Sequence, residues 1–250
     1  MILAKIKKFL PFILFGIGLL VLVLVYFLVI KPSKKVEEPV GKADALIEIG
    51  LNERPIASLT PTADGHLLNL KVEKITISAF SMDYELLYQL PDGRTQGVPG
   101  TITLNNQKSI ERKLLLGSES SGKFRYDEGV KEGTLTLRFR NDKGKLMVKY
   151  STKFALVSNT KELATIDGKF KANLTKIPAK TFFVVMETFG VPEATPVDIA
   201  TGPYGIFASS VASLMASIKL DSGDIYRYSG TKWENVTGEV PASGIFIASK

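Results

Sequence analysis

A run of apolar residues near the N-terminus constrains this chain more than any other feature. Residues 10–30, LPFILFGIGLLVLVLVYFLVI, contain no charged side chain. An α-helix rises about 1.5 Å per residue, so about 20 apolar residues cross the roughly 30 Å hydrocarbon core of a bilayer. Lysines that can reach the lipid headgroups flank the run, at Lys5, Lys7, Lys8, Lys31, Lys34 and Lys35. The sequence therefore predicts a single transmembrane helix over residues 10–30, with Tyr26 and Phe27 near one interface.

Two other interpretations of this run fit the residues less well. A cleaved signal peptide has an apolar core of about 7 to 15 residues, with a small-x-small cleavage site close behind it. Here the core is longer, and the first such site is residues 43–45, beyond Pro32 and Pro39. A pilin-like helix would carry an acidic residue early in its apolar run, and residues 10–30 contain none. The sequence therefore favours an uncleaved signal anchor.

The charges beside the helix leave its orientation open, because three lysines lie on each side. Residues 1–9 form a very short tail, whereas the bulk of the chain follows the helix. This arrangement is typical of a signal anchor whose short tail stays in the cytoplasm. We therefore predict a single-pass protein of the cell membrane, with a cytoplasmic N-terminus and extracytoplasmic C-terminal domains.

The net charge of +7 does not indicate a nucleic-acid binder, because the positive charge lies beside the predicted helix. Six of the 32 basic residues lie at or before Lys35, and no acidic residue does. The remainder of the chain has 26 basic and 25 acidic residues, a net charge of +1. The absence of cysteine excludes disulfides, thiolate metal sites and a cysteine nucleophile.

Residues 31–52 mix Lys, Glu, Pro and Gly with few large apolar side chains, which is typical of a flexible linker. Only residues 45–51, ALIEIGL, are apolar enough to dock on a folded domain. They fit a short strand and a helical turn equally well, so both alternatives stay open.

Beyond the linker, apolar and polar residues alternate, which predicts half-buried antiparallel strands. In Thr134–Arg140 the apolar side chains share one face of the strand and the polar ones share the other. Residues 145–156 repeat this pattern, and residues 141–144, Asn-Asp-Lys-Gly, predict a hairpin loop between the two strands. Turn signals recur at the spacing of a β-sandwich. We therefore predict a sandwich domain over residues 53–157.

The polar residues 158–161 follow a complete strand and predict a domain boundary. A second β unit is expected over residues 161–250, with strands at 170–174, 181–187, 205–208, 214–220, 225–228, 232–236 and 244–248. Residues 209–218 fit a helical face and a strand equally well. The predicted fold class is all-β: an N-terminal transmembrane helix followed by two antiparallel β-sandwich domains of the immunoglobulin or fibronectin kind.

A resemblance supports the second domain. The segments IPAKTFFVVMET, GPYGIFASSVASLMASIKLD, DIYRYSGTKWENV and SGIFIAS follow one another between about residue 169 and the C-terminus. In this order they resemble the last strands of ZU5-like and related β-sandwich modules of bacterial surface proteins. The resemblance implies a non-enzymatic unit that supports structure or interaction. The whole chain also resembles single-span envelope proteins of bacteria, and this similarity supplies no function.

Matches to catalytic motifs occur in unsuitable contexts. Gly117–Lys123 has the GxxxxGK spacing of a phosphate loop, but Phe124 replaces the Ser or Thr that holds Mg²⁺, and no helix is predicted after it. Ser-x-x-Lys pairs at 120–123 and 229–232 lie in predicted loops or hairpins. His66 is the only histidine and has no GxSxG partner. We therefore predict no enzyme activity, no catalytic residue, no nucleotide and no cofactor.

A metal site is not predicted either. Acidic pairs near turns, Asp221 with Asp224 and Asp127 with Glu128, offer oxygen ligands for Ca²⁺, but the chain contains no EF-hand loop. Calcium binding therefore stays an open alternative.

Residues 225–233, IYRYSGTKW, form the most distinctive cluster of aromatic residues. A two-residue turn would place Trp233 opposite Tyr226, and a four-residue loop would place it opposite Tyr228. Such a pair usually closes one end of a core. The alternative is an exposed platform that stacks on sugar rings, which makes Tyr226, Tyr228 and Trp233 a candidate ligand platform.

These observations predict a membrane-anchored, extracytoplasmic protein with a structural, adhesive or protein-interaction role in the bacterial envelope. Its expected partners are the lipid bilayer, contacted through the N-terminal helix, and another envelope protein or a wall glycan. Two alternatives are an accessory subunit of a membrane secretion or pilus-type assembly and a cell-wall glycan-binding module. The spacing of Gly16 and Gly18 is not the GxxxG pattern of close helix pairing, which disfavours the assembly subunit.

Overall fold

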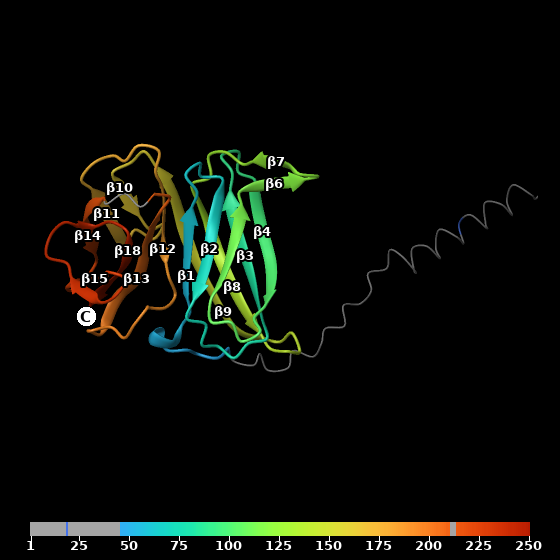
Figure 1. Cartoon of the computed structure of the whole chain (residues 1–250), viewed down its shortest axis with the longest axis horizontal. Helices are drawn as coiled ribbons and strands as arrows, with labels where there is room; N and C mark the ends of the chain where they lie inside the picture. Colours follow the sequence, from blue (N-terminus) through green and yellow to red (C-terminus); the bar gives the residue numbers. More distant parts are fainter. Residues whose placement is uncertain (1–18, 20–45, 211–213) are drawn as a thin grey trace, which may run out of the picture. The chain divides into compact units, whose positions relative to one another are not determined.

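The computed structural model describes Leu19, residues 46–210 and residues 214–250 (Figure 1). The predicted cytoplasmic tail, nearly all of the predicted span at 10–30 and most of the linker therefore lie outside the described residues. Within the described residues, no helix is long and apolar enough to cross a membrane. Leu46–Lys250 forms one compact unit.

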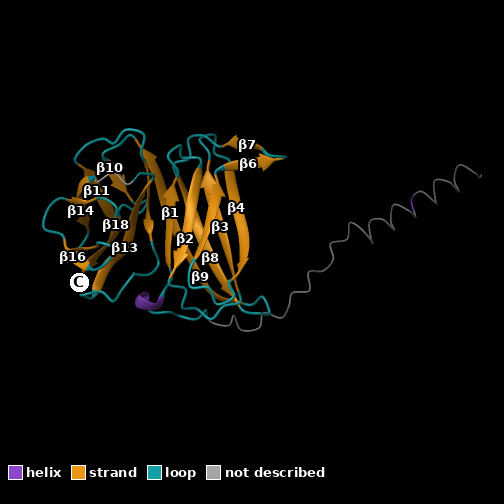
Figure 2. Cartoon of the chain, viewed as in Figure 1, coloured by secondary structure: helices purple, strands orange, loops and turns teal. Residues whose placement is uncertain are grey.

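This unit consists of strands and turns, with one 3₁₀ turn (Figure 2). In chain order its elements are η2 (Leu51–Glu53), β1 (Ile56–Pro61), β2 (Leu67–Glu73), β3 (Ser81–Gln89), β4 (Thr95–Thr103), β5 (Ile110–Leu115), β6 (Gly117–Ser120), β7 (Lys123–Tyr126), β8 (Glu132–Arg140), β9 (Leu146–Ser158), β10 (Glu162–Ala164), β11 (Phe170–Leu174), β12 (Phe182–Glu187), β13 (Ile199–Ala208), β14 (Met215–Leu220), β15 (Ile225–Tyr228), β16 (Trp233–Asn235), β17 (Val240–Pro241) and β18 (Gly244–Ser249). The predicted all-β class is confirmed for the described residues.

A nine-stranded antiparallel sheet forms the centre of the fold, with the order β16-β15-β18-β13-β12-β9-β8-β3-β4. A three-stranded sheet, β1-β2-β5, and a four-stranded sheet, β10-β11-β14-β17, pack on it. The β6–β7 pair belongs to none of these three sheets and projects from the body (Figure 1).

Strand β12 is buried on both faces, which places the two smaller sheets on opposite faces of the large one. Its side chains Val184 and Met186 lie in the core beneath β1-β2-β5, whereas Phe183 and Val185 lie in the core beneath β10-β11-β14-β17. Successive side chains of a strand point to opposite faces, so the uninterrupted apolar run FFVVM is the pattern expected of a strand covered twice.

Strand β12 also joins the two predicted domains. The predicted boundary at residues 158–161 falls between β9 and β10. Across it β9 pairs with β12, from Ser158 with Phe182 to Phe154 with Met186. The large sheet therefore runs through both halves, and Val184, Met186 and Phe189 of the second half lie in the core beneath β1-β2-β5. The number of independently folding domains stays a prediction.

Two alternatives left open by the sequence are resolved. Residues 46–50 form no strand: the Ile47 amide donates a hydrogen bond to the Met147 carbonyl (3.1 Å), and the turn η2 follows. Within residues 209–218, the described part that forms an element is a strand, because β14 begins at Met215 and pairs with β11. The predicted hairpin loop at 141–144 is confirmed between β8 and β9.

Candidate functional site

The candidate platform of Tyr226, Tyr228 and Trp233 lies on the β15–β16 hairpin. The register pairs Tyr228 with Trp233 and Tyr226 with Asn235, which is the outcome expected of a four-residue loop. The Ser229 amide closes the loop through a hydrogen bond to the Lys232 carbonyl (2.9 Å). The rings of Tyr228 and Trp233 are 5.3 Å apart and inclined at 60°.

This hairpin is part of the large sheet, so its aromatic side chains pack against sheet neighbours. Strand β15 pairs with β18, placing Tyr226 beside Ile247 and Tyr228 beside Ile245. All three aromatic residues of the platform are half-buried and share one face of the sheet. The Tyr228 hydroxyl donates a hydrogen bond to Glu193 Oε1 (3.1 Å). These contacts hold the platform against the body; its ligand role stays a prediction.

A second aromatic hairpin, β6–β7, was not predicted as a site. Its rings are far more exposed: Phe124 is 54% and Tyr126 is 40% accessible. The Tyr126 ring stacks on His66 with centroids 4.1 Å apart and an angle of 6°. The Phe124 and Tyr126 rings are 6.2 Å apart and inclined at 7°. Three nearly parallel rings therefore form a column that runs from the body outward along the hairpin.

The two faces of the β6–β7 hairpin differ in chemistry. Cross-strand pairing places Glu119 beside Phe124 and Gly117 beside Tyr126, so the aromatic rings share one face. The opposite face carries Lys123 and Arg125, paired with serines of β6. Every one of the side chains from Ser118 to Tyr126 is exposed. An isolated two-stranded hairpin is marginally stable in water, so its root must hold it in place.

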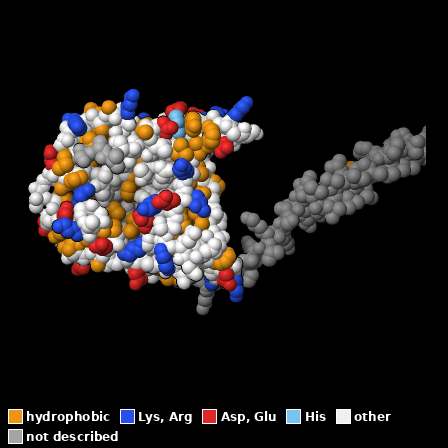
Figure 3. Space-filling view, viewed as in Figure 1, with side chains coloured by type: hydrophobic (Ala, Val, Ile, Leu, Met, Phe, Trp, Pro, Cys, Tyr) orange, Lys and Arg blue, Asp and Glu red, His pale blue; other side chains and the backbone are white. Residues whose placement is uncertain are grey.

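His66 connects the root of this hairpin to the body. Its Nε2 lies 3.2 Å from Glu128 Oε1, and its Nδ1 lies 3.4 Å from Asp64 Oδ2. The His66 carbonyl accepts a hydrogen bond from the Leu116 amide (2.9 Å). In Figure 3 the single histidine, in pale blue, lies among acidic and apolar side chains at this end of the body.

Two further contacts fix the root. The buried Tyr88 hydroxyl donates a hydrogen bond to Asp127 Oδ2 (2.8 Å), immediately after β7. A hydrogen bond from the Thr62 hydroxyl and one from the His66 amide lower the pKa of Asp64.

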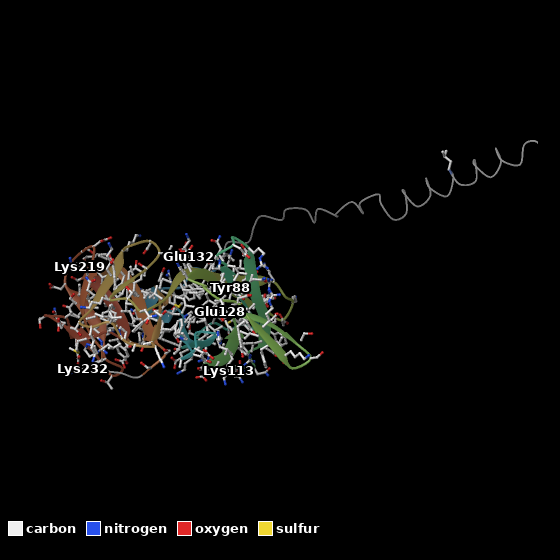
Figure 4. All side chains as sticks on the ribbon, turned by 90° about the horizontal axis from the view of Figure 1, so that it is seen from above. Tyr88, Lys113, Glu128, Glu132, Lys219 and Lys232 are labelled. Atoms are coloured by element: carbon white, nitrogen blue, oxygen red, sulfur yellow. The ribbon has the colours of Figure 1, made fainter. Side chains whose placement is uncertain are left out.

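Figure 4 labels Tyr88 and Glu128 in the same half of the body, well away from Lys232 of the other hairpin. A groove of about 350 Å³ beside the root is lined by Asp64, Asp127 and Glu128 among others.

The β6–β7 hairpin lies at the opposite end of its sandwich from the start of the folded unit. Residues 46–53 precede β1, whereas His66 follows it, and β1 runs along the sandwich between the two ends (Figure 1). The aromatic column therefore lies at the opposite end of the sandwich from Leu46, where the hairpin projects sideways from the body (Figure 1).

The residues of the remaining motif matches lie in hairpins of the described structure. Gly117–Lys123 spans the β6–β7 hairpin and opens no helix. Ser120 and Lys123 are cross-strand neighbours there, whereas Ser229 and Lys232 close the β15–β16 loop. Among the described residues, no group of three or more His, Asp or Glu side chains is arranged to hold a metal ion.

Comparisons with protein-family models, with curated proteins and with solved structures found no match.

Proposed function

We propose that this protein is a membrane-anchored, extracytoplasmic interaction protein of the bacterial envelope, and that the β6–β7 hairpin is its contact surface. One observation carries the proposal. A two-stranded hairpin outside the main sheets exposes Phe124 and Tyr126 at the end of the body remote from Leu46. Large aromatic side chains at such a position expose apolar surface to water and do not contribute to a buried core. Exposed aromatic groups of this kind are typical of binding surfaces.

The anchor in this proposal is the apolar run at residues 10–30. Residues 1–9 would remain in the cytoplasm, and residues 31–52 would connect the helix to the exported part. Two buried cores, one formed mostly by residues of 53–157 and the other by residues of 161–250, support two sandwich units of the immunoglobulin or fibronectin kind over these ranges. The resemblance of residues 169–250 to ZU5-like modules supports the same interpretation and a non-enzymatic role.

The two faces of the hairpin indicate the chemistry of the partner. Phe124 and Tyr126 would enter an apolar pocket, while Lys123 and Arg125 on the opposite face would meet acidic groups. A protein surface can supply both kinds of contact at once. We therefore propose a protein partner with an apolar pocket flanked by acidic side chains.

Site-specific crosslinking in the native membrane tests this proposal. A photoreactive residue at position 124 of the full chain should give one discrete protein adduct. The matched control is Ile177, which is 57% exposed compared with 54% for Phe124 and should give none. Reversing the charges with Lys123→Glu and Arg125→Glu should abolish the adduct. A heterogeneous adduct with wall polymer, or equal adducts from both positions, would contradict a protein partner at the hairpin.

Protease accessibility tests the orientation independently. Protease added to intact cells, after the outer layers are permeabilised, should digest the chain beyond Lys31 and leave the N-terminal tail protected. Protection of the β domains would place them in the cytoplasm. Crosslinks from the predicted span, with none from the hairpin, would favour the accessory-subunit alternative.

A further inference from the structure

The large sheet forks between β9 and β12. The two strands pair only from Ser158 and Phe182 as far as Phe154 and Met186. Beyond that point the chain after β12 bonds to other segments than β9. The Thr188 carbonyl accepts a hydrogen bond from the Ala57 amide (3.0 Å), and the Thr188 amide donates one to the Pro203 carbonyl (3.1 Å). The β9 strand continues beside β8 instead. The two strands therefore diverge.

A cavity of about 770 Å³, open to solvent, lies in the fork. One wall is the first half of β9, from Val148 to Ser151, and the other contains Glu187 and Phe189. Residues 46–50 and Arg54 close one side. The volume lies within the range of about 300 to 1,000 Å³ that is typical of small-molecule sites.

Several polar side chains line this cavity, among them Arg54, Tyr150 and Glu187. The Tyr150 hydroxyl is buried and has no hydrogen-bond partner in the part of the chain that the structure describes. Among the described residues, the Glu187 carboxylate makes no hydrogen bond and no ion pair, and the Arg54 guanidinium donates one side-chain hydrogen bond, from Nε to the Ile49 carbonyl (2.9 Å). Buried polar groups are nearly always satisfied, so the unpaired Tyr150 hydroxyl beside this cavity requires an explanation.

The charges of Arg54 and Glu187 influence each other without direct contact. Burial raises the pKa of Glu187, and the nearby Arg54 guanidinium partly opposes that rise. Burial likewise raises the pKa of Tyr150, again opposed by Arg54. Opposite charges that face one cavity but do not pair leave both ends of a dipole free. A ligand with complementary charges could satisfy them together.

We propose that the fork binds a small zwitterionic ligand, an amino acid or a short peptide. Its carboxylate would lie against the free guanidinium nitrogens of Arg54, and its ammonium group would lie against Glu187. The Tyr150 hydroxyl would hydrogen-bond to the ligand. The Tyr150 and Phe189 rings, 5.2 Å apart and inclined at 29°, would form an apolar wall for its side chains. This site is separate from the β6–β7 hairpin and does not depend on the function proposed for it.

Calorimetry on the purified full chain in detergent tests the ligand class, with L-alanyl-L-alanine as the probe. We expect saturable binding of the free dipeptide. Acetylation of its amine, or amidation of its carboxylate, should weaken binding at least about tenfold, because each change removes one charge. Equal binding of the blocked forms, or no saturation by about 10 mM, would overturn the proposal.

Variants of the cavity test the residues. Glu187→Gln and Arg54→Gln should each weaken dipeptide binding at least about tenfold, whereas the exposed controls Glu239→Gln and Lys219→Gln should not change it. Tyr150→Phe keeps the ring and removes only the unpaired hydroxyl. It should weaken binding about three- to tenfold without lowering the melting temperature. Wild-type affinity in all three cavity variants would overturn the assignment even if the dipeptide binds.

Discussion

The two aromatic hairpins of this protein differ in what lies beside them. The β15–β16 hairpin continues the large sheet, and its rings pack on the isoleucines of β18. The β6–β7 hairpin stands outside the main sheets, and its rings meet only one another and His66 among the aromatic groups described. A similar composition therefore gives half-buried rings on a sheet in one place and exposed rings in the other.

This contrast shows that aromatic content alone does not identify a binding platform. The neighbouring strand decides whether the rings are covered. Four variants test this contrast, and the largest effect is expected in the hairpin that belongs to the sheet.

Trp233→Ala should lower the free energy of unfolding by about 2 to 3 kcal/mol, somewhat below the loss for a fully buried tryptophan, because this side chain is only half-buried. Urea unfolding of the full chain in detergent measures the change. A loss below about 0.5 kcal/mol would show that Trp233 does not pack against the body, and would favour the glycan-platform alternative.

Tyr88→Phe should lower the free energy of unfolding by about 1 kcal/mol, because it removes the hydrogen bond from a buried hydroxyl to Asp127 at the root of β6–β7. The control is Tyr84→Phe in the same strand, since no hydrogen bond of its hydroxyl occurs among the described residues. Equal effects of the two variants would mean that the Asp127 contact does not stabilise the root.

Asp64→Asn should have a smaller effect that depends on pH. The folded-state pKa of Asp64 lies below its ordinary value of 3.8, so its contribution to stability is present above that pH and is lost as the pH falls through the folded-state value. Unfolding at neutral pH should show a less stable variant, and the difference should vanish in strong acid. A difference that persists in acid would contradict a role for the ionised carboxylate.

Phe124→Ala should have the smallest effect on stability, within about 0.5 kcal/mol, because the side chain is exposed at the outer end of the ring column. The same variant should abolish partner crosslinking, measured from a photoreactive residue at exposed position 118. A large stability loss would make β6–β7 a structural hairpin like β15–β16.

Many of the strands could be predicted, because the alternation of apolar and polar residues along the chain indicates them. The expected strands at Thr134–Arg140 and Ile225–Tyr228 agree with β8 and β15. The covering of β12 on both faces is equally visible in the apolar run FFVVM, although the sequence does not say which sheet covers which face. That assignment depends on contacts between distant strands.

The sites were harder to predict, because exposure is set by tertiary context. The Phe124 and Tyr126 rings follow a Gly-Ser-rich segment, and the alternation of Lys123 and Arg125 with them was the available signal for a two-faced hairpin. The stacking on His66 joins residues 60 positions apart, which no local pattern contains. The fork likewise depends on tertiary contacts of Thr188, above all the hydrogen bond to its carbonyl from the amide of Ala57, which lies far from it in the sequence.

The folded unit begins at one end of its first sandwich, and the β6–β7 hairpin lies at the other end. This arrangement has a mechanical consequence. A pull between the membrane and a bound partner would enter through β1 and leave through β5, with β2 between them. Such a load acts along the strands, so the ladder from Ile56 to Pro61 and the ladder from Leu67 to Val72 would be sheared as whole units, their hydrogen bonds resisting together. Peeling would instead break the bonds one at a time. With the proposed anchor and partner, this strand arrangement would make the sandwich a tether that resists tension between two surfaces.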